Sequence, residues 1–504
     1  MSQLRQPTLS GKFLARGAIW NFGGLAAPLV VGLFTIPLLV SGLGTERFGL
    51  LTIMWMGVGY FSLFDMGLGR ALTKLVAERL RMEDGVDLGP LIWTAIFLIF
   101  ALALIGTCLI LLVADPLVNH IFNIAPELKD ETIVAFRLLG IGLPLVAVTS
   151  ALIGLLEAHH RFATITAIRI PLGVASFIAP LISLQFTTSL VWATVALLGA
   201  RLLAFGAFYA AAAAIRCEMM QPTMPVRRQM PLLFQFGGWL TVTNIVGPVM
   251  VYFDRFFIGA AMSMTAVAYY AAPYSVLSRV QVLPTSILGV LFPALASVIA
   301  SDRTRLPRLY RKAVNALVLL MIPVMSGFFL LGPEALELWL GEEFRTAATP
   351  VVHWLALGWL INALARPAST VLQSAGRPDL TAKTHVLELI PYLLTLWLLI
   401  ENFGIAGAAA AWFLRVLVDT LILNALVWKL FPDLGPVIRQ TYLVAAGLLA
   451  GFLLAWLIES LALRFLLLAT VTTVCGVGLW PTIRSLLGGG GLTSFVSLAS
   501  RPTK

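Results

Sequence analysis

The stretch at residues 89–114 reads GPLIWTAIFLIFALALIGTCLILLVA and contains no charged residue. Folded as an α-helix, it is long enough to cross the hydrocarbon core of a bilayer, which takes roughly 20 apolar residues. Comparable apolar runs recur along the whole chain. Because a helix satisfies its own backbone hydrogen bonds in lipid, we predict an all-α polytopic membrane protein.

The composition of the whole chain agrees with this prediction. Of the 504 residues, 59% are hydrophobic and only 12% are charged, whereas a soluble domain carries about 25% charged residues. The net charge of +10 is concentrated in short loops between apolar runs. That placement indicates membrane topology and anionic lipid headgroups, and we expect no nucleic-acid partner.

Fourteen apolar runs have the length of a membrane span. They lie at 17–40, 47–69, 89–114, 132–156, 164–186, 189–214, 234–260, 265–296, 313–331, 349–373, 382–400, 405–429, 438–458 and 464–482. The loops on one side hold about two dozen Lys and Arg residues, against about four on the other side. This asymmetry predicts that both termini are cytoplasmic.

A proline-rich link at 215–233 divides the chain after six spans. We predict an N-terminal bundle, this linker, a second bundle, a terminal helix pair and a cytoplasmic tail, with bounds 1–214, 215–233, 234–430, 431–482 and 483–504. A weak parallel repeat supports the two bundles. Four residues near the start of the chain recur about 220 positions later. The pairs are Gly17 and Gly237, Trp20 and Trp239, Pro28 and Pro248, and Thr45 and Thr265.

Ionisable residues inside spans are costly and are therefore functional candidates. They are Asp65, Arg70, Arg137, Arg201, Asp254, Arg255, Arg279, Arg366, Glu388, Arg415 and Asp419. Arginine dominates, and its permanently charged fork suits a phosphate-bearing substrate.

Some of these residues also have structural interpretations. Arg415 and Asp419 are spaced to form an ion pair on one helix face. Arg70 can snorkel to the headgroups, and Arg137 can snorkel outward. Asp254 and Arg255 point about 100° apart on a helix, so that one can face a cavity while the other pairs elsewhere.

Three classes of function remain open at this point. The arginines favour a transporter for a phosphate-bearing substrate. A cation-coupled exporter of small molecules would instead use Asp65 or Asp254 as its ion-coupling site. A membrane polymerase is the third alternative, although the sequence has no phosphate loop, metal-ligand spacing or serine elbow. We expect no enzyme activity, catalytic residue, cofactor or metal.

Four segments resemble a known family. They are Ala15–Asn21 (ARGAIWN), Gly42–Leu50 (GLGTERFGL), Asp65–Gly69 (DMGLG) and Asp254–Gly259 (DRFFIG). In these segments the chain resembles the polysaccharide-biosynthesis flippases of the multidrug/oligosaccharidyl-lipid/polysaccharide exporter superfamily, in particular the Wzx-type O-antigen and exopolysaccharide translocases.

The resemblance implies a V-shaped pair of six-helix bundles, like that of the multidrug exporters of this superfamily, around a central cavity. It implies alternating access that moves an undecaprenyl-diphosphate-linked oligosaccharide across the bacterial inner membrane, coupled to an ion gradient. Spans one, two, seven and eight line the cavity in such flippases, so the cationic candidates for binding the diphosphate are Arg255, Arg279, Arg70 and Arg16.

The resemblance also bears on the end of the chain and on partners. Spans thirteen and fourteen resemble the lipid-tail groove of the peptidoglycan-precursor flippase, whose span-one arginines have no match here, where Asn21 and Pro28 stand. We therefore expect a different lipid-linked glycan. The predicted partners are membrane lipids and other polysaccharide-assembly proteins. Because the predicted bundles bury their own polar residues, we expect a monomer.

Overall fold

The computed structural model describes residues 27–28, 30–82, 88–215 and 221–485. Arg16 and the start of the predicted repeat, Gly17 and Trp20, lie outside this part of the chain. All regular secondary structure in the described residues is helical, without any strand. The predicted all-α class is therefore confirmed.

Ten helices in the described residues are long and apolar enough to cross a membrane, and Val30–Leu43 is a shorter apolar helix. One of the ten, α13 (Pro378–Leu430), contains a break at Gly404 with φ 58° and ψ −139°, and so comprises two helices. This break agrees with the two spans predicted at 382–400 and 405–429. The chain is a multi-pass membrane protein, and the number of fourteen spans stays a prediction.

The chain divides into two compact units, Met1–Ala268 and Tyr269–Lys504. This division falls beyond the 215–233 linker, because α8 (Met230–Ala261) belongs to the first unit. The arrangement of six helices in each bundle remains a prediction. Each unit is described by itself below.

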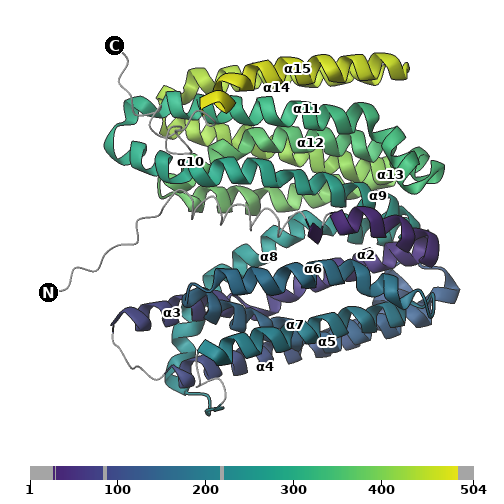
Figure 1. The fold of residues 1–504 in the computed structure, drawn as a ribbon, viewed down its shortest axis with the longest axis vertical. Helices are drawn as coiled ribbons and strands as arrows, with labels where there is room; N and C mark the ends of the chain where they lie inside the picture. Colours follow the sequence, from purple (N-terminus) through teal and green to yellow (C-terminus); the bar gives the residue numbers. More distant parts are fainter. Residues whose placement is uncertain (1–26, 29, 83–87, 216–220, 486–504) are drawn as a thin grey trace. The chain divides into compact units, whose positions relative to one another are not determined.

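In the first unit, α5 (Pro126–Ala158) is the central helix, since it packs against α3, α4 and α7. Gly154 lets α5 and α3 approach closely, because a methyl group there would lie 2.5 Å from the carbonyl oxygen of Gly69. The remaining helices of this unit (Figure 1) are α2 (Thr45–Tyr60), α3 (Leu68–Met82), α4 (Gly89–Pro116), α6 (Phe162–Ser183) and α7 (Leu190–Ile215).

The predicted span 47–69 is not one continuous helix. A short 3-10 turn at Phe61–Asp65 follows α2, and the chain then breaks at Met66 and Gly67, which have φ values of 47° and 71°. The Asp65 carboxylate accepts a hydrogen bond from the Gly67 amide at 2.8 Å. Positive φ is uncommon for a residue such as Met66, and this hydrogen bond helps to stabilise the turn that contains it.

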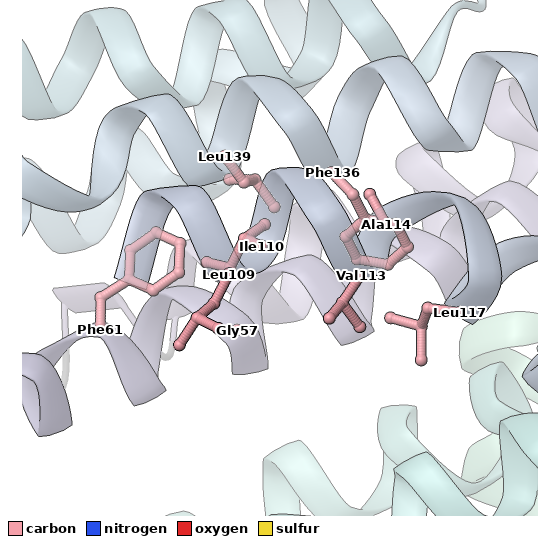
Figure 2. Close-up of a pocket in the computed structure, with 9 residues that line it drawn as sticks. All are labelled: Gly57, Phe61, Leu109, Ile110, Val113, Ala114, Leu117, Phe136 and Leu139. Carbon is pink, nitrogen blue, oxygen red and sulfur yellow. The ribbon is translucent and has the colours of Figure 1, made fainter. Parts of the chain in front are cut away.

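A cleft of about 290 Å³ opens between α2, α4 and α5 (Figure 2). Its lining is wholly apolar and consists of Gly57, Phe61, Leu109, Ile110, Val113, Ala114, Leu117, Phe136 and Leu139. At the end of α4 the chain continues through a π-helical turn, Leu117–Ile121, into α5.

In the second unit, α12 (Glu342–Ser374) is the most buried helix and packs against α10, α11 and α13. The other helices (Figure 1) are α9 (Met264–Leu277), which begins in the first unit, α10 (Val282–Ser301), α11 (Leu306–Leu340), α14 (Gly435–Trp456) and α15 (Leu461–Ser485). The 3-10 turn Ser278–Gln281 joins α9 to α10.

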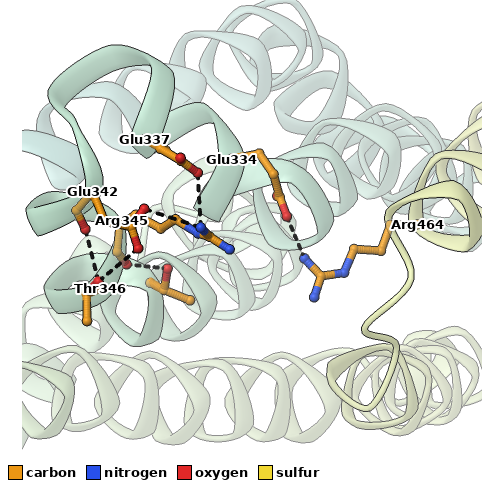
Figure 3. Close-up of polar contacts among 7 residues, drawn as sticks. Glu334, Glu337, Glu342, Arg345, Thr346 and Arg464 are labelled. Atoms are coloured by element: carbon orange, nitrogen blue, oxygen red, sulfur yellow. Dashed lines mark hydrogen bonds and ion pairs between the residues drawn. The ribbon is translucent and has the colours of Figure 1, made fainter.

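Ion pairs join the ends of α11, α12 and α15 (Figure 3). Arg464 at the start of α15 donates to Glu334 of α11 at 3.0 Å. Arg345 in the first turn of α12 pairs with Glu337 at 3.1 Å and with Glu342 at 3.3 Å. The terminal helix α15 is therefore joined to α11 by a charged contact as well as by packing.

Candidate functional site

Asp254 and Arg255 form the most buried charged pair of the first unit, with exposed fractions of 0% and 5%. The Arg255 Nη1 lies 3.4 Å from Asp254 Oδ1 and also donates to the carbonyl oxygen of Val251 at 3.2 Å. The sequence analysis allowed one of the two side chains to face a cavity while the other paired elsewhere. Instead, Arg255 turns back and pairs with its neighbour.

Two tyrosines lie in line beside Arg255. The Arg255 guanidinium lies over the Tyr252 ring, 5.4 Å from its centroid. The Tyr252 ring in turn contacts Tyr60 of α2 edge-on, with 5.5 Å between centroids. An arginine over an aromatic ring is held in place while its planar fork stays suited to phosphate oxygens.

The other candidates of the first unit differ in their surroundings. Asp65 is buried, and its Oδ1 accepts a hydrogen bond from the Gly67 amide. It therefore has a structural role at the break before α3. Arg70 lies in the first turn of α3 and is exposed. Arg137, predicted to snorkel outward, pairs with Asp115 where α4 ends, and both side chains are about half exposed.

Arg279 lies in the 3-10 turn between α9 and α10 and is exposed. It belongs to the second unit, whereas Arg255 and Arg70 belong to the first. A cavity shared by these arginines therefore stays a prediction, as does any role of Arg16, which lies outside the described residues.

A second group of charges lies inside the second unit, around Glu388 and Asp419, which are each 5% exposed. The predicted ion pair between Arg415 and Asp419 is wrong. Arg415 Nε lies 3.9 Å from Glu388 Oε2, and Asp419 Oδ1 lies 3.5 Å from His385 Nε2. Both contacts join the two halves of α13, because His385 and Glu388 precede Gly404 and their partners follow it.

Hydrogen bonding in this group is incomplete. Within the described residues, neither carboxylate oxygen of Glu388 has a hydrogen-bond partner, and Asp419 Oδ1 has none. Arg366 of α12 donates to Asn362 at 3.3 Å and is close enough to Asp419 for their charges to attract. A buried carboxylate without donors is expensive as an anion, so this group is suited to taking up a proton.

Sequence analysis found four of these residues but missed His385. The signal was present, because His385 and Glu388 are three residues apart and so share a helix face. Hydropathy does not reveal His385, since a single histidine barely changes the mean hydropathy of a long apolar span.

Comparison with known proteins gives the family. A model of the family described as polysaccharide biosynthesis protein matches residues 42–350, which is more than half of the chain. The chain belongs to this family. It is also 30% identical over 420 residues to a predicted O-antigen transporter of Shigella flexneri, an alignment that covers 83% of this chain and 98% of the relative.

Other relatives of this polysaccharide biosynthesis protein are more distant. A predicted flippase of Haloferax volcanii is 23% identical over 451 residues, covering 87% of this chain and 88% of that protein. These matches confirm the resemblance to polysaccharide-biosynthesis flippases that the sequence segments indicated.

Solved structures support the fold. The lipid II flippase MurJ in an inward closed conformation superposes with a TM-score of 0.70 at 14% identity, covering 93% of this chain and 99% of that one. An inward-facing multidrug resistance transporter gives a TM-score of 0.65 at 15% identity, covering 84% and 98%. The polysaccharide biosynthesis protein therefore has the fold of this exporter superfamily.

Proposed function

We propose that the protein is a flippase that moves an undecaprenyl-diphosphate-linked oligosaccharide across the bacterial inner membrane by alternating access, for synthesis of O-antigen or exopolysaccharide. The observation that carries the proposal is the similarity to an O-antigen transporter over almost that protein's whole length. The geometry adds a buried, aromatic-flanked arginine, Arg255, which has the chemistry to bind a diphosphate.

The proposed binding residues are Arg255 and Arg279, with Arg70 and Arg16 as further cationic candidates. Arg255 requires a careful test, because removing it takes away the cation that lies 3.4 Å from the buried Asp254 carboxylate. The single variant Arg255→Gln would therefore combine loss of binding with loss of this charge pairing. The double variant Asp254→Asn/Arg255→Gln removes both charges and isolates the binding contribution.

The experiment measures surface polysaccharide in a strain that lacks the protein and receives each variant at matched abundance. If Arg255 binds the diphosphate, the double variant folds but supports little polymer. If Arg255 only neutralises Asp254, the double variant restores polymer to the wild-type amount, and the proposed binding role is lost.

Arg279 allows a simpler comparison because it is exposed. Arg279→Gln should reduce polymer, whereas Arg308→Gln, at another exposed arginine of the second unit, should leave it unchanged. Equal effects of the two substitutions would argue against a specific role of Arg279.

We infer further that the transport cycle is coupled to protons through the Glu388 group. Its support is the buried Glu388 carboxylate without hydrogen-bond donors. Asp65 and Asp254 are the alternative coupling sites, although each already has a hydrogen-bond partner in the first unit.

A multidrug exporter is the second candidate function, favoured by the structural similarity to an inward-facing multidrug transporter. Drug tolerance on overexpression separates the two functions. An exporter raises tolerance independently of polysaccharide genes, whereas a flippase in reconstituted vesicles moves a lipid-linked glycan. Translocation without a change in glycan length would also exclude a polymerase.

A further inference from the structure

A buried histidine of α12, His353, takes no part in the charged groups discussed above. Its exposed fraction is 9%. Its ring stacks on Phe329 of α11 with 4.4 Å between centroids, and it lies 5.0 Å from the ring of Trp456 at the end of α14. Three helices of the second unit therefore meet around one imidazole.

The two ring nitrogens of His353 have different surroundings. The ring donates a hydrogen bond to the backbone carbonyl of Phe329, whereas Nδ1 is buried and has no hydrogen-bond partner among the described residues. In a neutral imidazole, one nitrogen donates and the other holds a lone pair. Because the bonded nitrogen is the donor, Nδ1 holds the lone pair and is the atom that can take up a proton.

A charged pair lies beside this histidine. Arg464, at the start of α15, donates to Oε1 of Glu334 at 3.0 Å (Figure 3). The other carboxylate oxygen, Oε2, is buried and has no hydrogen-bond partner in the described part of the chain. Both groups lie close enough to His353 for their charges to act on its ring, so Glu334 would attract an imidazolium and Arg464 would repel it.

The remaining helices around His353 face it with aromatic side chains. Trp456 of α14 lies against the ring, and Phe413 of α13 packs on the neighbouring residue Trp354. On α12 itself, Arg345 lies eight residues before His353, which is about two helical turns. The response of His353 to a proton therefore depends on Glu334 and Arg464.

Arg464 also holds the turn that leads into α15. Its Nε donates to the carbonyl oxygen of Ile458 at 2.7 Å, and its amide donates to the carbonyl oxygen of Ser460 at 3.1 Å. Only 6% of the apolar stretch of α15 is buried, so little packing supports this attachment. A segment with few buried contacts is one that can open locally.

We propose that Nδ1 of His353 is a proton-binding site that controls the attachment of α15 to α11. While His353 is neutral, Glu334 serves Arg464 alone and the turn stays closed. An imidazolium is costly in this buried position, competes with Arg464 for the Glu334 carboxylate and repels the guanidinium. The proton therefore binds better once the turn has opened and water reaches the ring, so acid favours the open turn.

The predicted topology places this site on the outer side of the membrane. With both termini cytoplasmic and fourteen spans, the connection between α14 and α15 faces outward, so the site would respond to external pH. The proposal does not depend on the proposed flippase function or on proton coupling through Glu388.

The test measures hydrogen exchange of the full chain in nanodiscs at about pH 7.5 and about pH 5.5, a range in which histidine titrates while exposed carboxylates stay ionised. Peptides that cover residues 457–465 report on the turn, after correction for the intrinsic pH dependence of exchange. A water-exposed histidine has a pKa of about 6.5, so the lower pH should favour opening by up to about tenfold. In the wild-type chain, this segment should exchange faster in acid by that factor.

His353→Gln removes the proton site and keeps an amide that can donate to the Phe329 carbonyl. The turn should then be equally protected at both pH values. His120→Gln, at an exposed histidine of the first unit, is the matched control and should keep the wild-type response to acid. Glu334→Gln weakens the contact with Arg464, so the turn should exchange faster already at neutral pH.

Three outcomes would overturn the proposal. The wild-type turn could exchange equally at both pH values. His353→Gln could keep the full response to acid, which would assign that response to a carboxylate. Finally, His353→Gln and His353→Met could both lose protection at neutral pH, which would make His353 a packing residue and not a proton site.

Discussion

The guanidinium of Arg415 lies 3.9 Å from the carboxylate of Glu388 and forms no ion pair with Asp419, four residues further along its own helix. The contact crosses from the second half of α13 to the first. Arg415 also lies over the ring of Tyr392, 5.8 Å from the centroid. A charged pair at this depth balances a large desolvation cost against mutual attraction.

Glu388→Gln should keep the protein folded and remove its response to a proton gradient. The substitution leaves the buried Arg415 guanidinium without this anionic partner, so thermal stability should fall, as it does when a buried pair loses one member. In reconstituted vesicles, an imposed pH gradient should accelerate translocation by the wild-type chain and not by this variant. Glu401→Gln, at an exposed glutamate of the same helix, is the matched control, and a normal pH response of Glu388→Gln would contradict the coupling role.

Arg415→Met should destabilise the second unit, since it leaves Glu388 buried without its closest cation. Breaking one partner of a buried pair costs about 3–5 kcal/mol. The melting temperature of the detergent-solubilised protein measures the effect. Combining Arg415→Met with Glu388→Gln should recover most of the loss, and failure to recover would mean that the packing of Arg415 on Tyr392 matters more than its charge.

Asp65→Asn and Asp65→Ala separate a structural role from a coupling role. Asparagine keeps an oxygen that can accept the Gly67 hydrogen bond, so Asp65→Asn should preserve both stability and transport. Asp65→Ala should lower stability by about 1 kcal/mol through loss of this bond. If Asp65→Asn is stable but no longer transports, then Asp65 is the ionisable coupling group.

Gly154→Ala should disrupt the crossing of α3 and α5. The added methyl would lie 2.5 Å from the Gly69 carbonyl oxygen, and backbone atoms cannot turn away as a side chain can. Overpacking of this kind costs about 1–3 kcal/mol. Gly206→Ala on α7, where a methyl meets nothing within 4 Å, should leave the melting temperature unchanged, and equal shifts would show that the crossing is loose.

The connection between α10 and α11 should become less ordered in acid. A hydrogen bond from the Thr304 hydroxyl holds the pKa of Asp302 below its usual value, and the Thr304 amide also donates to this carboxylate at 3.1 Å. Because the pKa is depressed in the folded state, the stabilisation is present above the usual value and is lost as the pH falls through the folded-state pKa. Hydrogen exchange at Thr304, corrected for its intrinsic pH dependence, should show decreasing protection in acid, and Asp302→Asn should remove that change.

Hydropathy predicted much of the fold, because lipid forces the chain to satisfy its backbone within helices. The predicted span 89–114 corresponds to α4, Gly89–Pro116, and the predicted span 349–373 lies within α12, Glu342–Ser374. The break at Met66 and Gly67 was missed, because an apolar average does not register two residues of positive φ. The sequence signal there was Asp65 followed two residues later by glycine, a spacing typical of a side-chain turn.

The candidate site was less predictable. Spacing of four residues suggested an Arg415–Asp419 pair, because that rule describes an isolated helix. In the folded protein Glu388 competes for the arginine from another part of the chain. The adjacent pair Asp254–Arg255 likewise depends on a side-chain rotamer that helical geometry does not determine.

Gly404 has a consequence for which changes of length this protein tolerates. Surface connections between helices ordinarily accept insertions and deletions, and Phe403 beside Gly404 is exposed. An insertion at this break changes the connection and not the phase of the following helix, because regular helical geometry ends at Gly404. Each half of α13 can keep its own buried face, with Arg415 and Asp419 opposite Glu388 and His385. This connection should therefore accept an added residue, whereas one residue added inside either half would rotate the remainder of that half by about 100°.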